Sequence, residues 1–344
     1  MFYITVDSKS LSISPRLKIS NNLTAHSISL AVYELESYLE ENMNAGGGFI
    51  IREFLKHAKG KYSKLLCADD IPTEDCIEKL VNYLEYNNDK DFVFGDAEYI
   101  NTQGKPLHST VFKSRNGFNI NYSENDLLAR FFKGISMLPY PCVLVKTEDL
   151  KSININNTLI PIFDMTMWVE LMLSGRKIGF TEDVVIRYRI HDGQLSGKNN
   201  EKIINQYSMY EREVLNKLFL KITNYEQLKA VCKYSPYIDK ISQDDVKYFP
   251  FVIAHYALLK YGQKWAYIYL NEMLDDDMKL KELKEKFNFG IKEFRKLYST
   301  PLGSANPLNK EAKLINKILL FIRYPKYVLR YYVLRTKMRN KYSL

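Results

Sequence analysis

The sequence predicts an α/β layer fold with a largely parallel sheet, followed by a helical region. Three observations support this prediction. Short strands and helices alternate over the first 198 residues, long helical stretches follow the polar run at 197–200, and 46% of the 344 residues are hydrophobic. Alternating strands and helices are typical of parallel strands joined by helical crossovers. We therefore expect one domain at residues 1–198 and a helical region at residues 199–344.

The elements of the first region follow from hydrophobic periodicity and turn signals. We expect strands at residues 2–6, 62–67, 91–95, 143–146, 177–180 and 184–190. We expect helices at 49–58, 73–86 and 163–174, and residues 27–41 should be mostly helical. Thr73 is a candidate N-cap for its helix, whose apolar face is formed by Ile77, Leu80, Val81 and Leu84. Gly104 marks a turn, and Gly175 closes the helix before it.

Composition limits the class of protein. The four cysteines are far apart and form no CxxC pair, which favours reduced thiols in the cytoplasm. The longest apolar run, residues 315–322, is far below the roughly 20 residues that a spanning helix needs. The chain starts directly with a strand-like run, so we expect neither a signal peptide nor a transmembrane helix.

Charge is distributed unevenly. Residues 1–200 contain 22 Lys and Arg against 25 Asp and Glu, a net −3, whereas residues 201–344 contain 27 against 15, a net +12. A basic region of this kind suits nucleic acid or an anionic membrane surface. The basic charge lies in the tail and no nucleic-acid recognition motif accompanies it, so we do not expect a nucleic-acid partner.

The clearest candidate site follows the strand at 62–67, where Asp69 and Asp70 end an apolar run. Ligands of open α/β sheets bind beyond the carboxyl ends of the strands. Two carboxylates there can hold Mg²⁺ or Mn²⁺ and, through the ion, a phosphate. The alternative is structural, with Asp70 or Thr73 capping the next helix.

An ordered set of short motifs resembles family 2 glycosyltransferases, which have the GT-A fold. The segment from Asn44 through Gly46 to Arg52 resembles that family's Asn-x-Gly turn and helix, and Lys59 to Asp70 resembles its Lys-Gly-x-Tyr and Asp-x-Asp-Asp motifs. The later matches are residues 92–96 with Gly104-Lys105, the helix start at 163–171, and Arg187 to His191 with Ser196. The set spans residues 44–196, over half of such a domain.

The resemblance implies a role for each matching residue. Asp69 and Asp70 would bind the divalent ion and the donor's diphosphate, with His191 beside the metal or the pyrophosphate, and Asp164 would be the general base. Asn44 matches the turn that contributes to the donor site. Arg189 is a candidate phosphate contact, although it is equally compatible with a residue that only flanks a strand. Attack opposite the leaving group would invert the anomeric centre.

The chain departs from the family pattern at three places. Cys67 occupies the position of the motif's first Asp, and a thiol is a poor ligand for Mg²⁺ or Mn²⁺. Phe163 replaces the usual Glu before the base. The family's first strand and helix are not recognisable: residues 4–10 resemble the second strand instead, which makes Asp7 the candidate reader of the nucleotide base.

The tail at residues 311–344 alternates aromatic and aliphatic residues with Lys and Arg. This pattern is typical of a helix at a membrane interface, so we expect a peripheral position on the inner face of the cell membrane. The predicted function is sugar transfer from a nucleotide-diphosphate sugar to a hydroxyl of a glycan or lipid-linked acceptor, in surface polysaccharide or glycan synthesis. The alternative is a catalytically degenerate protein of the same fold that acts as a binding or scaffold subunit.

Overall fold

The structure is a computed structural model, and it describes residues 2–6, 31–32, 47–114, 118–194 and 201–299. The chain divides into two compact units, Met1–Tyr256 and Ala257–Leu344. The candidate site lies in the first unit. Residues on both sides of the predicted boundary at 198 belong to that unit, and the predicted division of the chain stays a prediction.

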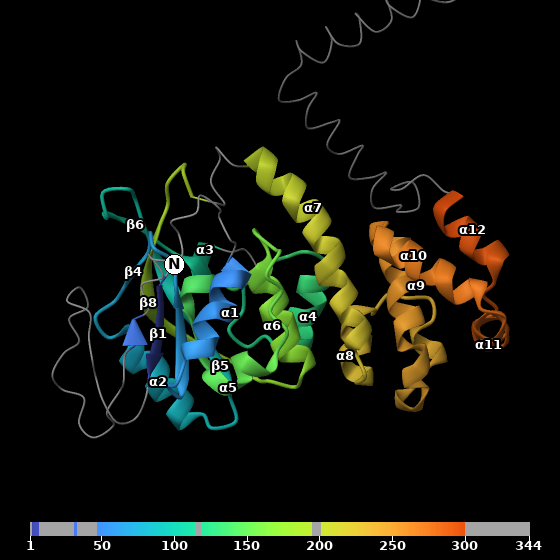
Figure 1. Cartoon of the computed structure of the whole chain (residues 1–344), viewed down its shortest axis with the longest axis horizontal. Coiled ribbons are helices and arrows are strands. Elements are labelled where there is room, and N and C mark those ends of the chain that lie inside the picture. The colour runs from blue at the N-terminus through green and yellow to red at the C-terminus, as the bar shows by residue number, and fades with distance from the viewer. Residues whose placement is uncertain (1, 7–30, 33–46, 115–117, 195–200, 300–344) are drawn as a thin grey trace, which may run out of the picture. The chain divides into compact units, whose positions relative to one another are not determined.

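The first unit contains a mixed sheet with the strand order β2-β1-β3-β7-β5-β8-β4, and β6 pairs with β5 (Figure 1). The strands are β1 (Phe2–Val6), β2 (Ala31–Val32), β3 (Tyr62–Leu66), β4 (Ile71–Pro72), β5 (Phe92–Ile100), β6 (Pro106–Thr110), β7 (Val143–Lys146) and β8 (Ile178–Arg189). Helices of this unit are α1 (Gly47–His57), α2 (Cys76–Tyr86), α3 (Val111–Ser114), α4 (Glu124–Phe132), α5 (Thr147–Ser152), α6 (Phe163–Leu173), α7 (Glu201–Lys217) and α8 (Tyr225–Val231).

The prediction of a largely parallel sheet is wrong. Among the strand pairs that the structure describes, only β5 and β8 run parallel, and the other pairs are antiparallel. Element order along a chain does not fix strand direction. The short turn at Asn101–Lys105, with Gly104 at φ +80°, forces β6 to return antiparallel to β5. Mixed α/β architecture is what the structure shows.

The side chains of β5 and β8 contact helices on both faces of the sheet. Val93 lies opposite Gly179 on one face, and a Cβ on Gly179 would overlap the Tyr83 ring of α2. Phe92 and Phe94 face the other side, where the fully buried Trp168 of α6 lies 6.3 and 5.1 Å from their ring centroids. The Trp168 ring therefore belongs to the core.

Several predicted elements are confirmed within a few residues. β7 matches its predicted span, α6 ends before Gly175, and the Gly175 and Arg176 N–H groups bond to the Met172 and Leu171 carbonyls in a Schellman-like turn. The two strands predicted around residues 177–190 form the single strand β8.

Other boundaries differ. α2 starts at Cys76 after Asp75, and Thr73 does not cap it: the Thr73 hydroxyl donates to Asp75 Oδ1 at 2.8 Å, and the Thr73 N–H bonds to the Val185 carbonyl beside β4. Ala31 and Val32, within the stretch expected to be mostly helix, form β2; the rest of that stretch lies outside the described residues.

The run of glycines before α1 has a packing role. A Cβ on Gly47 would overlap the ring of Phe163, and a Cβ on Gly48 would overlap the backbone carbonyl of Asn156. Both positions are buried. Helix α1 therefore approaches the start of α6 and the loop before it more closely than any larger residue permits.

We expect Gly48→Ala to lower the free energy of unfolding by about 1–3 kcal/mol, because a backbone carbonyl cannot move aside as a side chain can. Denaturant unfolding measures this loss. Gly193→Ala is the control, since its Cβ would meet its nearest neighbour, His191 Nδ1, at an ordinary 3.4 Å. Equal stability of the two variants would contradict the packing role.

Residues 257–299, the described part of the second unit, are mostly helical. Helix α9 (Phe249–Tyr261) spans the division between the units, and α10 (Lys264–Asp275), α11 (Asp277–Phe287) and α12 (Ile291–Ser299) follow. Asp276 caps α11 by accepting from the Met278 and Lys279 N–H groups at 3.0 and 3.1 Å. The predicted basic tail at 311–344 lies outside the described residues.

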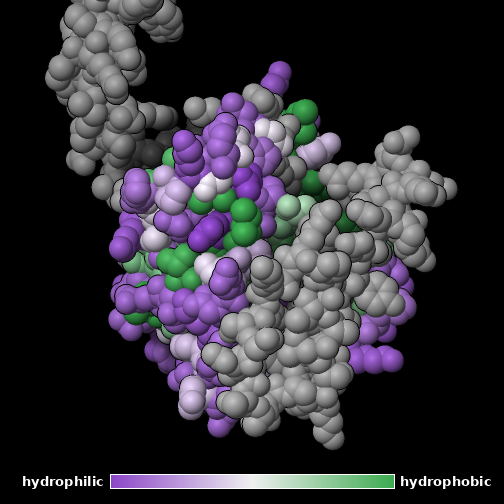
Figure 2. Space-filling model, turned by 90° about the vertical axis from the view of Figure 1, so that its left-hand side faces the viewer, coloured by the Kyte–Doolittle hydropathy of each residue, from purple (hydrophilic) through white to green (hydrophobic). Residues whose placement is uncertain are grey.

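Among the described residues, none of the helices combines the length and the apolarity needed to cross a bilayer. On the face shown in Figure 2, hydrophobic residues occur in small groups between hydrophilic ones wherever the chain is coloured.

Candidate active site

The acidic turn after β3, residues 67–70, forms one wall of the site. All five residues of β3 are buried, which fixes the point where the strand ends, and the Asp70 N–H bonds back to the Cys67 carbonyl at 3.4 Å. One ligand atom from each of Cys67, Asp69 and Asp70 lies within 4.8 Å of the others. The structure thus brings together the two carboxylates that the sequence singled out.

The end of β8 holds this turn in place. The Arg189 N–H donates to Asp70 Oδ1 at 2.9 Å, and the ring nitrogen Nε2 of His191 lies 3.1 Å from Asp69 Oδ2. His191 is therefore next to the acidic turn, as the motif resemblance implies.

Arg189 has a different environment from the expected phosphate contact. Its guanidinium donates to three backbone carbonyls: Asp69 at 2.9 Å, Asn101 at 3.1 Å and Thr102 at 2.9 Å. These bonds join the acidic turn to the β5–β6 hairpin. Arg189 is also outside the set of described residues that line the cavity. This geometry favours the structural alternative, although a phosphate role stays a prediction.

Burial shapes the protonation of the acidic turn. Burial raises the pKa of Asp70 from its ordinary 3.8 to about 6, against the opposing effect of the Arg189 N–H bond, and the nearby Asp69 charge raises it further. Burial also raises the pKa of the Cys67 thiol, with the two aspartates adding to the shift. Cys67 is consequently a neutral thiol at physiological pH.

The donor set decides which ion would suit the turn. Asp69 and Asp70 supply carboxylate oxygens and His191 an imidazole nitrogen, ligands that Mn²⁺ accepts and that Mg²⁺ accepts in part. The protonated thiol of Cys67 is a poor third ligand. The residues present fit an oxygen-preferring divalent ion held by Asp69 and Asp70.

Removing the Asp70 charge should stabilise the metal-free protein. The folded-state pKa lies above the unfolded value, so Asp70 destabilises the fold progressively as pH rises from about 4 to about 6, and fully above that. An Asn side chain can still accept the Arg189 N–H bond. We expect Asp70→Asn, in a chelator, to raise the melting temperature more at about pH 7.5 than at about pH 4.5. A difference from wild type that is constant across this range would contradict it.

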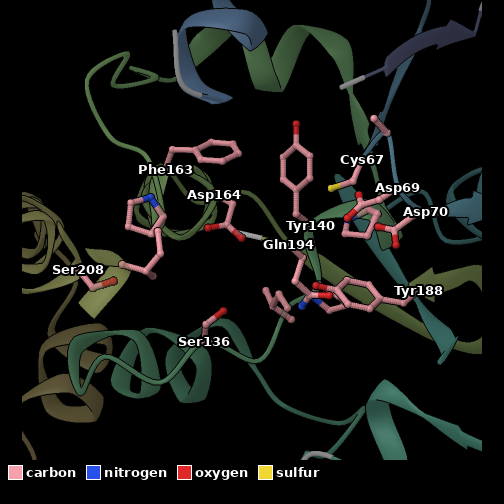
Figure 3. Close-up of a pocket in the computed structure, with 16 residues that line it drawn as sticks. Cys67, Asp69, Asp70, Ser136, Tyr140, Phe163, Asp164, Tyr188, Gln194 and Ser208 are labelled. Carbon is pink, nitrogen blue, oxygen red and sulfur yellow. The ribbon is translucent and has the colours of Figure 1, made fainter. Parts of the chain in front are cut away.

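A cavity of about 490 Å³ joins the acidic turn to α6. Figure 3 shows Asp164 between Phe163 and Ser208 on one side and the acidic turn on the other, with its carboxylate directed into the cavity. Its Oδ1 accepts the Met165 N–H at 2.7 Å, which fixes the side chain in the first turn of α6. The structure therefore places Asp164 on the same cavity as Asp69 and Asp70.

The start of α6 is held by two side chains from other parts of the first unit. Glu211 of α7, which is 8% exposed, accepts the N–H groups of Ile160 and Ile162 at 2.8 and 3.2 Å. Phe163 packs against Tyr140, with ring centroids 5.2 Å apart. Phe163, at the position of the family's Glu, thus contributes packing to this junction.

Several residues that line the cavity carried no predicted role: Ser136, Leu138, Pro139, Tyr140, Pro141, Pro161, Tyr188, Gln194, Ile204 and Ser208. Of these, Tyr188 lies within the Arg187–His191 motif and Gln194 follows that motif, so the motif gave a local signal for both. Ile204 and Ser208 lie on α7, beyond the predicted boundary at 198, where no local pattern pointed to the cavity.

Other candidate residues are resolved as follows. Asp96, at the end of the 92–96 motif match, is buried and accepts the Ala97 and Phe112 N–H groups at 2.8 and 2.9 Å, so its carboxylate bonds to the backbone. Asp7 and Asn44, the predicted base reader and donor-site residue, lie outside the described residues.

About half of the chain is similar in sequence to known proteins. No protein-family model matches. The chain is 28% identical over 174 residues to an uncharacterized glycosyltransferase of Methanocaldococcus jannaschii, covering 50% of this chain and 57% of that protein. Uncharacterized glycosyltransferases of Rickettsia felis and Rickettsia typhi are 29% and 27% identical, over 52% and 49% of this chain and 30% and 50% of those proteins.

Solved structures give a weaker comparison. Staphylococcus aureus TarS covers 74% of this chain and 43% of its own, with 15% identity and a TM-score of 0.38. TarS 1–349 in complex with UDP-GlcNAc covers 66% and 72%, with 12% identity and a TM-score of 0.34. These low scores identify neither the fold nor the function. The chain matches between about a third and somewhat over half of the length of these three sequence relatives. All three are named glycosyltransferases.

Proposed function

We propose that the chain is an inverting glycosyltransferase of the family 2 type, with a GT-A-like first domain that uses Mg²⁺ or Mn²⁺. The observation that carries the proposal is that Asp69, Asp70 and Asp164 line the same cavity, with the first two at one side and Asp164 at the other. The sequence similarity to proteins named glycosyltransferases supports the same reaction class.

In this proposal the acidic turn receives the donor's diphosphate. A divalent cation bound there would neutralise charge on the leaving nucleotide. Asp69 and Asp70 would hold this cation. The contacts of Arg189 and His191 keep both carboxylates oriented before the donor arrives.

Asp164 acts on the acceptor. Its carboxylate points into the cavity and takes the proton of the attacking hydroxyl as the new glycosidic bond forms and the nucleoside diphosphate leaves. Attack from the side opposite the leaving group inverts the anomeric centre. The Met165 N–H bond keeps the carboxylate in place during this step.

The wider setting is also a proposal. The acceptor is a glycan or lipid-linked hydroxyl compound of surface polysaccharide or glycan synthesis, and the protein works in the cytoplasm beside the membrane. The basic tail at 311–344, with its alternating aromatic and cationic residues, supports an anionic membrane as partner.

Incubation of the wild-type chain with a panel of nucleotide-diphosphate sugars and Mn²⁺ tests the proposal, with release of nucleoside diphosphate as the measurement. Metal-dependent binding and release are expected. Binding of a protein partner without binding of any nucleotide sugar would favour the scaffold alternative, which the Cys67 and Phe163 substitutions suggest.

A further inference from the structure

The side of the cavity remote from the acidic turn has its own chemistry. It is lined by Ser136, Pro161, Phe163, Ile204 and Ser208. In Figure 3, Ser208 lies on the other side of Asp164 from the acidic turn, with Phe163 above Asp164 and Ser136 below it. We call these five residues the α7 end of the cavity, because α7 supplies Ile204 and Ser208. If the donor diphosphate occupies the acidic turn, the acceptor's reacting hydroxyl must approach Asp164 from this end.

Charge around the cavity is acidic. Asp69, Asp70 and Asp164 all line it, and among the described lining residues these carboxylates are the charged side chains. A further anion placed beside Asp164 would be repelled in a partly desolvated space, where screening is weak.

The polar groups of the α7 end suit uncharged hydroxyls. Ser136 and Ser208 each carry a hydroxyl that can donate and accept, as sugar hydroxyls do (Figure 3). Phe163, Pro161 and Ile204 add apolar surface for the C–H groups of a sugar ring. A few placed polar groups within an apolar wall are typical of small-molecule sites.

We propose that the α7 end binds an uncharged sugar residue of the acceptor and discriminates against sugars with a carboxylate or phosphate beside the reacting hydroxyl. This inference rests on the proposed function and adds the chemical class of the acceptor. The carboxylate of Asp164, which a cation at the acidic turn does not neutralise, supplies the discrimination, and the two serines with their apolar neighbours supply the recognition.

Matched acceptors test the inference. Octyl glycosides of neutral hexoses are compared with the corresponding uronic acids and with the methyl esters of those acids, using a donor that the chain binds. We expect the uronic acids to be at least tenfold poorer in kcat/KM than the neutral sugars, and the methyl esters to recover most of the loss. Added salt should reduce the difference.

A charge-reversal variant sharpens the test. Ser208→Lys places a cation on the cavity wall and should improve the uronic acids at least tenfold relative to the neutral sugars. Met209→Lys is the matched control, because Met209 is the next residue of α7, is 53% exposed and lies outside the cavity lining, so the preference should not change.

Three results would overturn the inference: uronic acids used as well as their esters, an equal effect of the two lysine variants, or donor binding with neither transfer to nor binding of any neutral sugar. Failure of the proposed function is a different result, since no nucleotide sugar would then bind.

Discussion

Asp164→Asn is expected to lower sugar transfer by about 10²–10⁴-fold, the usual contribution of a positioned general base. The variant keeps the shape of the side chain, and its Oδ1 can still accept the Met165 N–H that Asp164 accepts at 2.7 Å. Asp164 lies in the first turn of α6, after the N-cap Ile162, so loss of its charge costs only the helix-dipole contribution of about 0.3–1 kcal/mol. The main loss is the ability to take a proton.

The structural alternative for Asp164 makes the opposite prediction. A carboxylate in the first turn of a helix gains about 0.3–1 kcal/mol from the helix dipole, and a residue with only this role would be replaced by Asn at little cost to activity. The decisive comparison is therefore transfer rate against melting temperature and donor affinity. In the catalytic case the rate falls while the other two stay near wild type.

Asp277→Asn is the matched control for this experiment. Asp277 lies in the first turn of α11, is exposed and belongs to the second unit, outside the cavity lining. The same substitution there should leave transfer unchanged. Wild-type transfer by Asp164→Asn would show that Asp164 is not the base.

Local signals in the sequence were enough to place one wall of the site. An apolar run followed by Asp69 and Asp70 predicts a buried strand that ends in a polar turn, and β3 with its acidic turn has this form. The helix that starts beside Asp164 and closes at Gly175 is equally local, because a helix C-terminus depends on a few adjacent residues.

Contacts between distant segments could not be predicted in the same way. The Arg189 bond to Asp70 joins residues 119 apart, and nothing in the periodicity of β8 shows where its last residues will bond. For the same reason the strand directions were wrong: hydrophobic alternation fixes which face a residue occupies, not which neighbour the strand pairs with or in which direction.

The wall formed by α7 shows this limit most clearly. The polar run before residue 201 suggested a domain boundary, yet Glu211 of α7 bonds to the Ile160 and Ile162 N–H groups. Those bonds position the segment from which α6 and Asp164 begin. A side chain with such a role appears in the sequence only as one charged residue in an amphipathic helix.

Asp69→Asn and Asp70→Asn are each expected to weaken metal-dependent binding of nucleoside diphosphates at least tenfold. The physical reason is that the acidic turn offers two carboxylates within reach of one ion, and an amide oxygen carries no charge to hold it. Isothermal titration with a nucleoside diphosphate, in Mn²⁺ and again after chelation, measures the effect. In the chelated state wild type and both variants should bind equally weakly.

Asp192→Asn is the control for a general loss of negative charge, since Asp192 is exposed, follows His191 directly and is outside the described cavity lining. It should bind as wild type does.

A pH series adds a second criterion. Because the pKa of Asp70 is raised to about 6, protons compete with the metal ion, and the wild-type affinity for the nucleoside diphosphate in Mn²⁺ should fall as pH decreases through that value. Asp70→Asn should lose part of this dependence. Unchanged Mn²⁺-dependent binding by Asp70→Asn would remove the metal from the acidic turn, and with it the route by which this cavity is proposed to hold a nucleotide sugar.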